Sequence, residues 1–379
     1  MPEKANLDTI RTTNSKLILN LLRKKCISRA EISDITGLTR SAVTTITQYL
    51  IATGQIKEVG TEATAAGRAP VLLDIVKDYR YAMGILFHRK EIAVCIVNLK
   101  LECIETRRQS IECFQTPEDA TDWAYREGLR ILEKFNISFD HCIGIGISSP
   151  GPLNCMTGDI FMPPNFPLFH HFNPVTHLSQ KCSYPIYINN APVPMAVYEM
   201  QTQLANLQNS IFIVVDKGVG AAILQNGSIY YGRNGFSGEF GHISVDYQGK
   251  SCSCGGRGCL ECYVTRNAIL NEFQMDSYEE IVDHAYDGNE AALAVLEYIA
   301  NHLSTAIVST VNLLDLESVV IWGELNYRHK LLFSMIEKTV NDRIMRPKSY
   351  PITIIPSNIN RKNDLAFVAS IVIQNYFSP

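Results

Sequence analysis

From residue 81 onward, short apolar runs rich in β-branched residues alternate with longer segments that have helical periodicity. A short apolar run predicts a buried strand, and apolar residues three and four positions apart predict a helix that packs on it. Their alternation predicts an α/β body in which helices flank the sheets. We expect strands at 81–87, 91–99, 142–148, 184–190, 210–224 and 317–323, and helices at 117–135, 289–314 and 331–345.

Composition places the chain among globular proteins. Its 379 residues are 46% hydrophobic and 19% charged, which supports a packed core and corresponds to two or three domains. No apolar run reaches the roughly 18–20 residues that a membrane span needs, and the first sixteen residues are too polar for a signal peptide. We therefore expect a cytoplasmic protein without a membrane partner, in which most of the eleven cysteines are reduced.

The first seventy residues predict three short helices. Leu17, Ile18, Leu21 and Leu22 share one helix face, and "SRAEISDITGL" then offers Ser28 and Glu31 in the spacing of a capping box. Gly37 can take the left-handed conformation that ends this second helix. In the second helix Ile32 and Ile35 are predicted to face inward. In the third, which follows Thr39, Val43, Ile46, Tyr49 and Leu50 form the predicted buried face.

Two short helices joined by a glycine turn are typical of a helix-turn-helix, whose second helix enters the major groove of DNA. Strands predicted at 55–60 and 71–76 flank a small-residue loop that carries Arg68, which indicates a wing. Residues 1–70 hold ten Lys and Arg against six Asp and Glu, whereas the rest holds 24 against 32. A small helical protein-interaction domain is the alternative. We predict DNA contacts from Thr39, Arg40, Ser41, Thr44, Thr45, Gln48 and Arg68.

Four of the cysteines crowd into residues 251–262, "SCSCGGRGCLEC". With the preceding His242, the cysteines at 252, 254 and 259 give the spacing H-x9-C-x-C-x4-C, and three thiolates with one imidazole complete a tetrahedral zinc shell. A disulfide between Cys252 and Cys254 would close a very small ring, and the cluster lacks the thioredoxin-like βαβ context in which a redox CxxC motif occurs. We predict a structural zinc ion held by His242, Cys252, Cys254 and Cys259, with Cys262 as a packed bystander.

A zinc ion at this position would anchor a loop. It would draw Glu239 of "GEFGH" and Glu261 of "CLE" towards a common pocket. Paired carboxylates can accept hydrogen bonds from neighbouring sugar hydroxyls. The alternative is that both are surface acids.

The ordered set of motifs resembles the ROK family (repressor, open reading frame, kinase), and within it the repressors of sugar utilisation. The resemblance extends over nearly the whole chain. It rests on the helices and wing of residues 14–70 and on "GIGISSPGPLN", "MPPNFP", "GEFGH" and "CSCGGRGCLE". It implies a winged helix-turn-helix domain at 1–76 and a sugar-binding domain at 77–379 with its zinc loop at 242–262. The implied fold of the second domain is the two-lobed, actin-like or ribonuclease-H-like fold of sugar kinases, with the sugar in the cleft between the lobes. By position, the implied sugar contacts come from Asn165, Asn189, Asn190, Glu239, His242 and Glu261.

Two departures from the family's kinases argue against phosphorylation. "INNAP" has Asn190 where the kinases carry the Asp that acts as general base, and an amide cannot accept the proton. "GILFHRKE" has Leu86 at the position of the phosphate-loop Asp, and the late Gly-Gly pair is here Gly323 and Glu324. We therefore expect no enzyme activity.

The resemblance implies a DNA-binding repressor of sugar-utilisation genes that is controlled by a sugar ligand. We expect it to bind a palindromic operator as a homodimer or a dimer of dimers, because two-fold DNA sites mirror two-fold proteins. The family's pattern favours release of DNA when the sugar binds. The alternatives are a sugar kinase with an accessory DNA-binding domain, and a regulator that responds to a protein partner instead of a sugar.

Overall fold

A computed structural model describes residues 7–61, 70–202, 204, 207–360 and 365–378. The chain divides into two compact units. The first contains the described residues of 1–153, 157–189 and 361–379, and the second contains 154–156 and 190–360.

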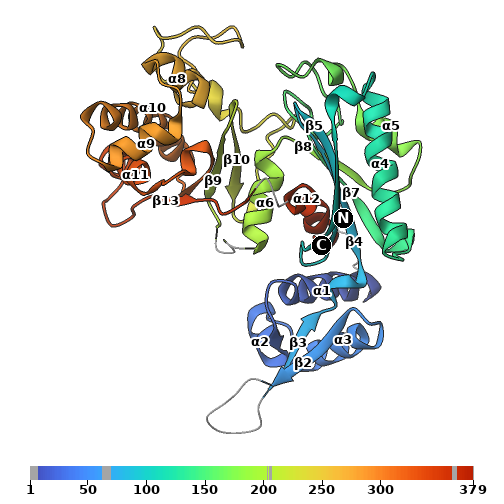
Figure 1. Cartoon of the computed structure of the whole chain (residues 1–379). Helices are drawn as coiled ribbons and strands as arrows, with labels where there is room; N and C mark the ends of the chain where they lie inside the picture. Colours follow the sequence, from blue (N-terminus) through green and yellow to red (C-terminus); the bar gives the residue numbers. More distant parts are fainter. Residues whose placement is uncertain (1–6, 62–69, 203, 205–206, 361–364, 379) are drawn as a thin grey trace. The chain divides into compact units, whose positions relative to one another are not determined.

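The N-terminal module of the first unit combines three helices with a small antiparallel sheet of order β1-β3-β2 (Figure 1). Its elements are α1 (Leu7–Leu22), β1 (Ile27–Ser28), α2 (Arg29–Thr36), α3 (Arg40–Ala52), β2 (Ile56–Thr61) and β3 (Val71–Ile75). The pairing of β2 with β3 confirms the predicted wing hairpin, and α2 with α3 confirms the two helices of the helix-turn-helix.

The predicted helix boundaries in this module are confirmed, but the burial of two residues is not. Ser28 caps α2 in a complete capping box with Glu31, Gly37 ends that helix at φ 71°, and Thr39 caps α3. However, Ile35 and Tyr49 are 52% and 44% exposed, so their predicted burial is wrong, and Leu17, which shares a face of α1 with Ile18, is 40% exposed. They lie at the edges of narrow apolar stripes whose centres, such as Ile18 and Ile32, are fully buried.

The larger sheet of the first unit has strand order β6-β5-β4-β7-β8. Strands β4, β5 and β6 form an antiparallel meander, and β7 and β8 run parallel to β4. The elements are β4 (Tyr81–Phe87), β5 (Glu91–Asn98), β6 (Cys103–Ser110), α4 (Pro117–Lys134), β7 (Cys142–Ser148), α5 (Pro174–Ser179), β8 (Ile186–Asn189) and α12 (Ala366–Phe377).

Helices lie against both faces of this sheet. A Cβ added to Gly84 of β4 would meet the backbone of Ala369 in α12 at 3.1 Å, whereas one added to Gly128 of α4 would meet the Met83 side chain at 2.3 Å. Met83 and Gly84 are adjacent, so they point to opposite faces of the strand. Because α4 and α12 each cover one face, all seven residues of β4 are buried, which explains its unbroken apolar sequence.

The sheet of the second unit has the order β11-β10-β9-β12-β13, again with a three-stranded meander followed by two strands parallel to its first member. Its strands are β9 (Ser210–Val215), β10 (Val219–Gln225), β11 (Ser228–Ile229), β12 (Ser318–Gly323) and β13 (Thr353–Pro356). Its helices are α6 (Pro192–Thr202), α7 (Glu261–Val264), α8 (Arg266–Phe273), α9 (Tyr278–Tyr286), α10 (Glu290–Leu314) and α11 (Lys330–Arg343). One topology is thus used twice, as expected for an actin-like, ribonuclease-H-like fold.

The single strand predicted at 210–224 is wrong, because the segment folds back at Asp216–Gly218 to form the antiparallel pair β9 and β10.

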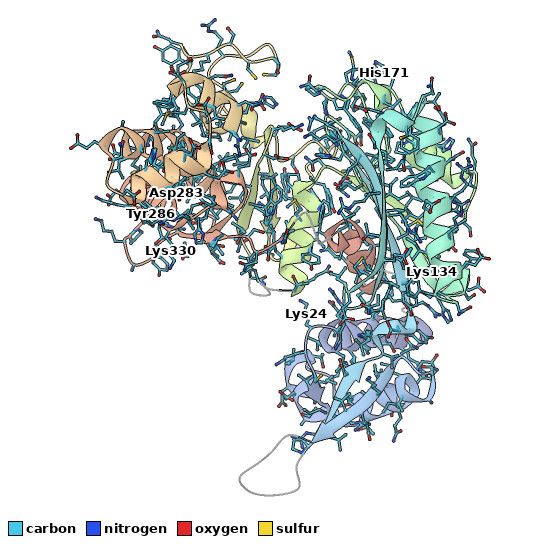
Figure 2. The ribbon with its side chains drawn as sticks, in the orientation of Figure 1. Lys24, Lys134, His171, Asp283, Tyr286 and Lys330 are labelled. Carbon is cyan, nitrogen blue, oxygen red and sulfur yellow. The ribbon has the colours of Figure 1, made fainter. Side chains whose placement is uncertain are left out.

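The described residues also contain short 3-10 turns: η1 (Lys77–Tyr79), η2 (Ile111–Cys113), η3 (Phe139–His141), η4 (Pro167–Phe169), η5 (Phe240–His242) and η6 (Glu324–Asn326). At the junction of α9 and α11, where Figure 2 labels Asp283, Tyr286 and Lys330, the Tyr286 hydroxyl donates to the carbonyl oxygen of Arg328 at 2.9 Å.

Helix α10 is the one helix of the described residues that is long and apolar enough to cross a membrane by length and composition. Its most apolar 18-residue window is 56% buried inside the protein. Ile299, Leu303 and Ile307 on its buried face are fully enclosed in the core of the second unit. Core packing therefore accounts for the apolar character of α10.

Candidate functional site

The second helix of the helix-turn-helix, α3, has one buried and one exposed face. Val43, Ile46, Thr47 and Leu50 are buried against the rest of the module. The polar residues predicted to contact DNA, namely Thr39, Arg40, Ser41, Thr44, Thr45 and Gln48, are all exposed. Arg68, the predicted wing contact, lies outside the described residues.

A partly buried polar contact that the sequence analysis missed holds α3 in place. The Arg29 Nε donates to Thr47 Oγ1 at 3.1 Å, and its Nη2 pairs with Glu58 Oε1 of β2 at 3.0 Å. One guanidinium of α2 thus joins α3 to the wing strand. The sequence did not indicate this role for Thr47, because nothing distinguishes it from the nearby threonines Thr44 and Thr45, which are exposed.

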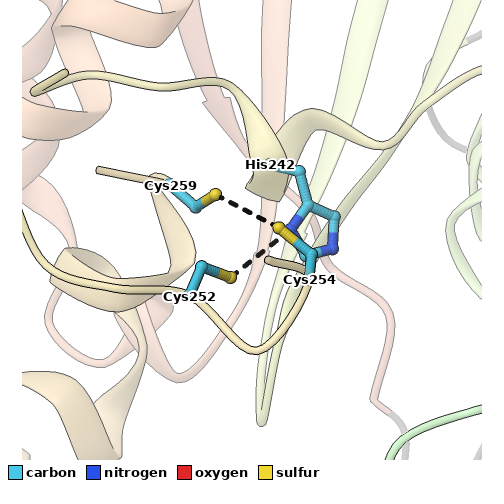
Figure 3. A group of neighbouring side chains, drawn as sticks. All are labelled: His242, Cys252, Cys254 and Cys259. Atoms are coloured by element: carbon cyan, nitrogen blue, oxygen red, sulfur yellow. Dashed lines mark hydrogen bonds between the residues drawn. The ribbon is translucent and has the colours of Figure 1, made fainter. Parts of the chain in front are cut away.

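In the second unit, the structure brings His242, Cys252, Cys254 and Cys259 together (Figure 3). One ligand atom from each lies within 4.8 Å of the others, and this group could hold a metal ion. The sulfurs of Cys254 and Cys259 are 3.6 Å apart, and the Cys252 sulfur is 3.7 Å from His242 Nδ1. A tetrahedral ion with Zn–S bonds of about 2.3 Å places its sulfurs roughly 3.8 Å apart, so the donor set fits zinc in chemistry and in spacing.

Glycines allow the backbone to turn tightly around this cluster. Gly258 has φ 69°, and a Cβ there would lie 1.6 Å from the carbonyl oxygen of Asp246. Hydrogen bonds from Val245 N to Gly258 O and from Leu260 N to Ile243 O join the two segments that carry the ligands. The segment with His242 also packs closely on strand β10, because a Cβ on Gly241 would lie 2.3 Å from the carbonyl oxygen of Val219. The backbone itself therefore shapes the ligand cage.

The thiols of the cluster differ in acidity. The Gly256 amide donates to the Cys254 sulfur and lowers the pKa of that thiol to about 7. Burial raises the pKa of Cys252 and of Cys259. A metal binds the thiolate form, and the Gly256 amide hydrogen bond stabilises that form of Cys254.

Two carboxylates lie beside the cluster, and their convergence on a common pocket stays a prediction. Glu261 Oε1 lies 3.7 Å from His242 Nδ1 and accepts a hydrogen bond from the Cys252 thiol at 3.2 Å, whereas Glu239 Oε2 lies 4.0 Å from His242 Nε2. Burial raises the pKa of Glu239 above its usual value. The two ring nitrogens of His242 therefore face different partners, with the thiols on the Nδ1 side and Glu239 on the Nε2 side.

A cluster of side-chain contacts around Lys250, within the segment 242–262, was not predicted from the sequence. Its ammonium pairs with Glu272 of α8 at 2.7 Å and lies 4.9 Å from the centre of the Tyr263 ring. Tyr263 stacks on His302 of α10, and its hydroxyl accepts from the Lys250 amide. These contacts fasten the loop to two helices independently of a metal.

The remaining predicted sugar contacts are divided between the units. Asn165 and Asn189 belong to the first unit, where Asn165 is exposed with φ 55° and Asn189 is buried at the end of β8. Asn190 belongs to the second unit with Glu239, His242 and Glu261. Leu86 lies buried within β4. A common sugar site for the six contact residues therefore stays a prediction.

The chain belongs to the ROK family, whose model matches residues 82–374. Among characterised relatives, it is 26% identical to the xylose repressor of Bacillus spizizenii, over 97% of this chain and 96% of that protein. It is also 26% identical to the DNA-binding transcriptional dual regulator NagC of Escherichia coli, over 97% and 94%.

Solved structures confirm the fold. A ROK family transcriptional regulator described as a homologue of the Escherichia coli MLC protein superposes with a TM-score of 0.80 at 24% identity, covering 97% of both chains. The ROK hexokinase of Thermus thermophilus superposes with a TM-score of 0.67 at 19% identity and covers 78% of this chain and 99% of its own. The match to the regulator therefore extends over nearly the whole chain, whereas the match to the kinase leaves about a fifth uncovered.

Proposed function

We propose that this protein is a sequence-specific DNA-binding transcriptional repressor of sugar-utilisation genes, controlled by a sugar bound to its ROK domain. The observation that carries the proposal is the presence, in one chain, of a winged helix-turn-helix with an exposed polar second helix and a ROK domain. Relatives named as xylose and N-acetylglucosamine repressors match over 97% of the chain, including this module. We assign the DNA-binding domain to 1–76 and the sugar-binding domain to 77–379.

Selection of binding sites from random duplexes, followed by affinity measurements on the selected DNA, tests the DNA-binding part. We expect a palindromic site, and we expect Arg40→Ala to weaken binding because the exposed Arg40 begins α3. Arg130→Ala, which removes an exposed arginine on α4, is the matched control. If no sequence is enriched over random DNA, the proposal is wrong.

The metal in this proposal is zinc, and its role is structural. Four protein donors complete a tetrahedral shell and leave no open position for a substrate. Metal analysis of the purified protein should find about one zinc per chain. Cys254→Ser should lose the metal, whereas Cys262→Ser should keep it, since the Cys262 thiol points to the carbonyl oxygen of Ser251. A full zinc content in Cys254→Ser would contradict the assignment of Cys254 as a zinc ligand.

We further propose that the ROK domain binds its sugar without phosphorylating it. Asn190 cannot act as the general base that the family's kinases use, and Leu86 places an apolar side chain at the phosphate-loop position. An ATP-coupled assay over hexoses, pentoses and amino sugars should show no turnover above background. Sustained turnover would support the kinase alternative. We expect the repressor to act in the cytoplasm as a homodimer or a dimer of dimers.

A further inference from the structure

The exposed face of α3 contains two adjacent threonines whose hydroxyl groups bond to their own helix. Thr44 Oγ1 lies 2.8 Å from the carbonyl oxygen of Arg40, and Thr45 Oγ1 lies 3.0 Å from that of Ser41. A carbonyl oxygen can only accept, so each hydroxyl donates its one proton to the helix. What each side chain then offers to an approaching molecule is oxygen lone pairs and a methyl group.

This proton arrangement limits the DNA groups that the two threonines can bind. Phosphate oxygens are acceptors, and so are the N7 and O6 atoms of guanine in the major groove. Neither can receive a hydrogen bond from a hydroxyl whose proton is already used. Adenine N6 and cytosine N4 are donors, and thymine adds a methyl group. An A·T pair therefore complements both the lone pairs and the methyl groups of these side chains.

The N-terminal end of the same face has the opposite chemistry. Arg40, the first residue of α3, is exposed, and its guanidinium can only donate. Guanine N7 and O6 are the base atoms that best complement it. Along α3, a donor at the first residue is thus followed one turn later by a pair of acceptors.

We infer that Thr44 and Thr45 determine operator specificity, and that they recognise A·T pairs through adenine N6 and the thymine methyl next to a guanine contacted by Arg40. This inference rests on the proposed DNA-binding function and names the bases that it selects. In this hydrogen-bonded arrangement the two threonines offer no proton to a phosphate, so the inference assigns them to bases.

Two kinds of substitution separate the oxygen from the methyl group. Thr44→Val and Thr45→Val keep the shape and the methyl group but lose the acceptor, whereas Thr44→Ser and Thr45→Ser keep the acceptor but lose the methyl group. Thr53→Val is the matched control, because Thr53 is exposed just after α3 and makes the same bond to the carbonyl oxygen four residues earlier, at 2.9 Å.

The experiment uses the full chain, with binding sites selected from random duplexes for each variant and affinities measured on the wild-type site. The valine variants should bind that site about tenfold more weakly and lose their preference for adenine at one position each. The serine variants should stop distinguishing thymine from uracil in the same duplex. Thr53→Val should select the wild-type site with unchanged affinity.

The outcomes separate this inference from the function on which it depends. If the wild-type protein enriches no sequence, the proposed function fails. If it enriches a site but the valine variants select the same site with the same affinity, the threonines do not contact bases and only this inference fails. Equal weakening on selected and random DNA would mean that the hydroxyls turn towards phosphates, which would also overturn it.

Discussion

Gly258 shows at the scale of one residue how the backbone shapes the metal loop. Its φ of 69° is unfavourable for any other residue, and an added Cβ would lie 1.6 Å from the Asp246 carbonyl oxygen. Gly255 has φ 90°, but an added Cβ there would have no heavy atom within 4 Å. The two positions therefore share the conformational requirement and differ in the steric one.

We predict that Gly258→Ala loses the metal and lowers the thermal stability of the protein, whereas Gly255→Ala keeps the metal. Gly255→Ala is the control. It should lower the free energy of unfolding by about 1–2 kcal/mol, because its only penalty is the left-handed backbone conformation. Metal analysis and thermal unfolding of both variants measure the difference. Equal metal content in the two variants would contradict the steric explanation.

The same loop shows what sequence can and cannot predict at this scale. The spacing of three cysteines and a histidine indicates a metal cage, because the ligand chemistry is restrictive and three of the four ligands are close in sequence. The role of Lys250 depends on Glu272 and Tyr263, which come from separate helices. A lysine beside a glycine gives no sign of such partners. Long-range packing, and not local chemistry, decides these positions.

At the scale of single elements, the start of α2 couples helix stability to pH. The Ser28 amide and hydroxyl donate to Glu31 Oε2 at 2.8 and 3.0 Å. The hydrogen bond from the amide is the main cause that lowers the pKa of Glu31. A lowered carboxyl pKa stabilises the folded state above the unfolded value of about 4.3. That stabilisation is lost as the pH falls through the lowered folded-state pKa.

We therefore predict that Glu31→Gln reduces the protection of α2 amides from hydrogen exchange near pH 6, and that the difference from wild type shrinks towards pH 3. Asp34→Asn changes an exposed acid of the same helix and should show no such convergence. Hydrogen exchange of the full chain, corrected for intrinsic rates, measures both. A Glu31→Gln difference that stays constant with pH would show that the carboxylate does not stabilise the cap.

Strong local signals predicted most elements, and weak ones were missed. Helix α4 was predicted to within one residue at its end. Thr116 and Pro117 mark its start, and its apolar period continues to its last turn. The edge strand β6 was missed, since "CIETRRQS" is polar and half exposed. Helix α12 was missed for the opposite reason. It is buried almost all round, so it has no polar face from which a period could be recognised.

At the scale of the whole molecule, the repeated strand order of the two sheets is the property that sequence alone did not give. Alternating strands and helices predict an α/β body, but they do not distinguish one sheet from two. The resemblance to the ROK family supplied that expectation, and the structural matches confirm it. The division of the predicted sugar contacts between two units likewise has no local signature.

The most direct test of the central claim measures the affinity of the full chain for its selected operator with and without each sugar of a broad panel. One sugar should change the affinity at least about tenfold, a typical coupling between sites. Glu261→Gln should abolish the response while the zinc content and DNA affinity stay at wild-type levels. Specific DNA binding that no sugar alters, together with ATP-dependent phosphorylation of a sugar, would contradict the account.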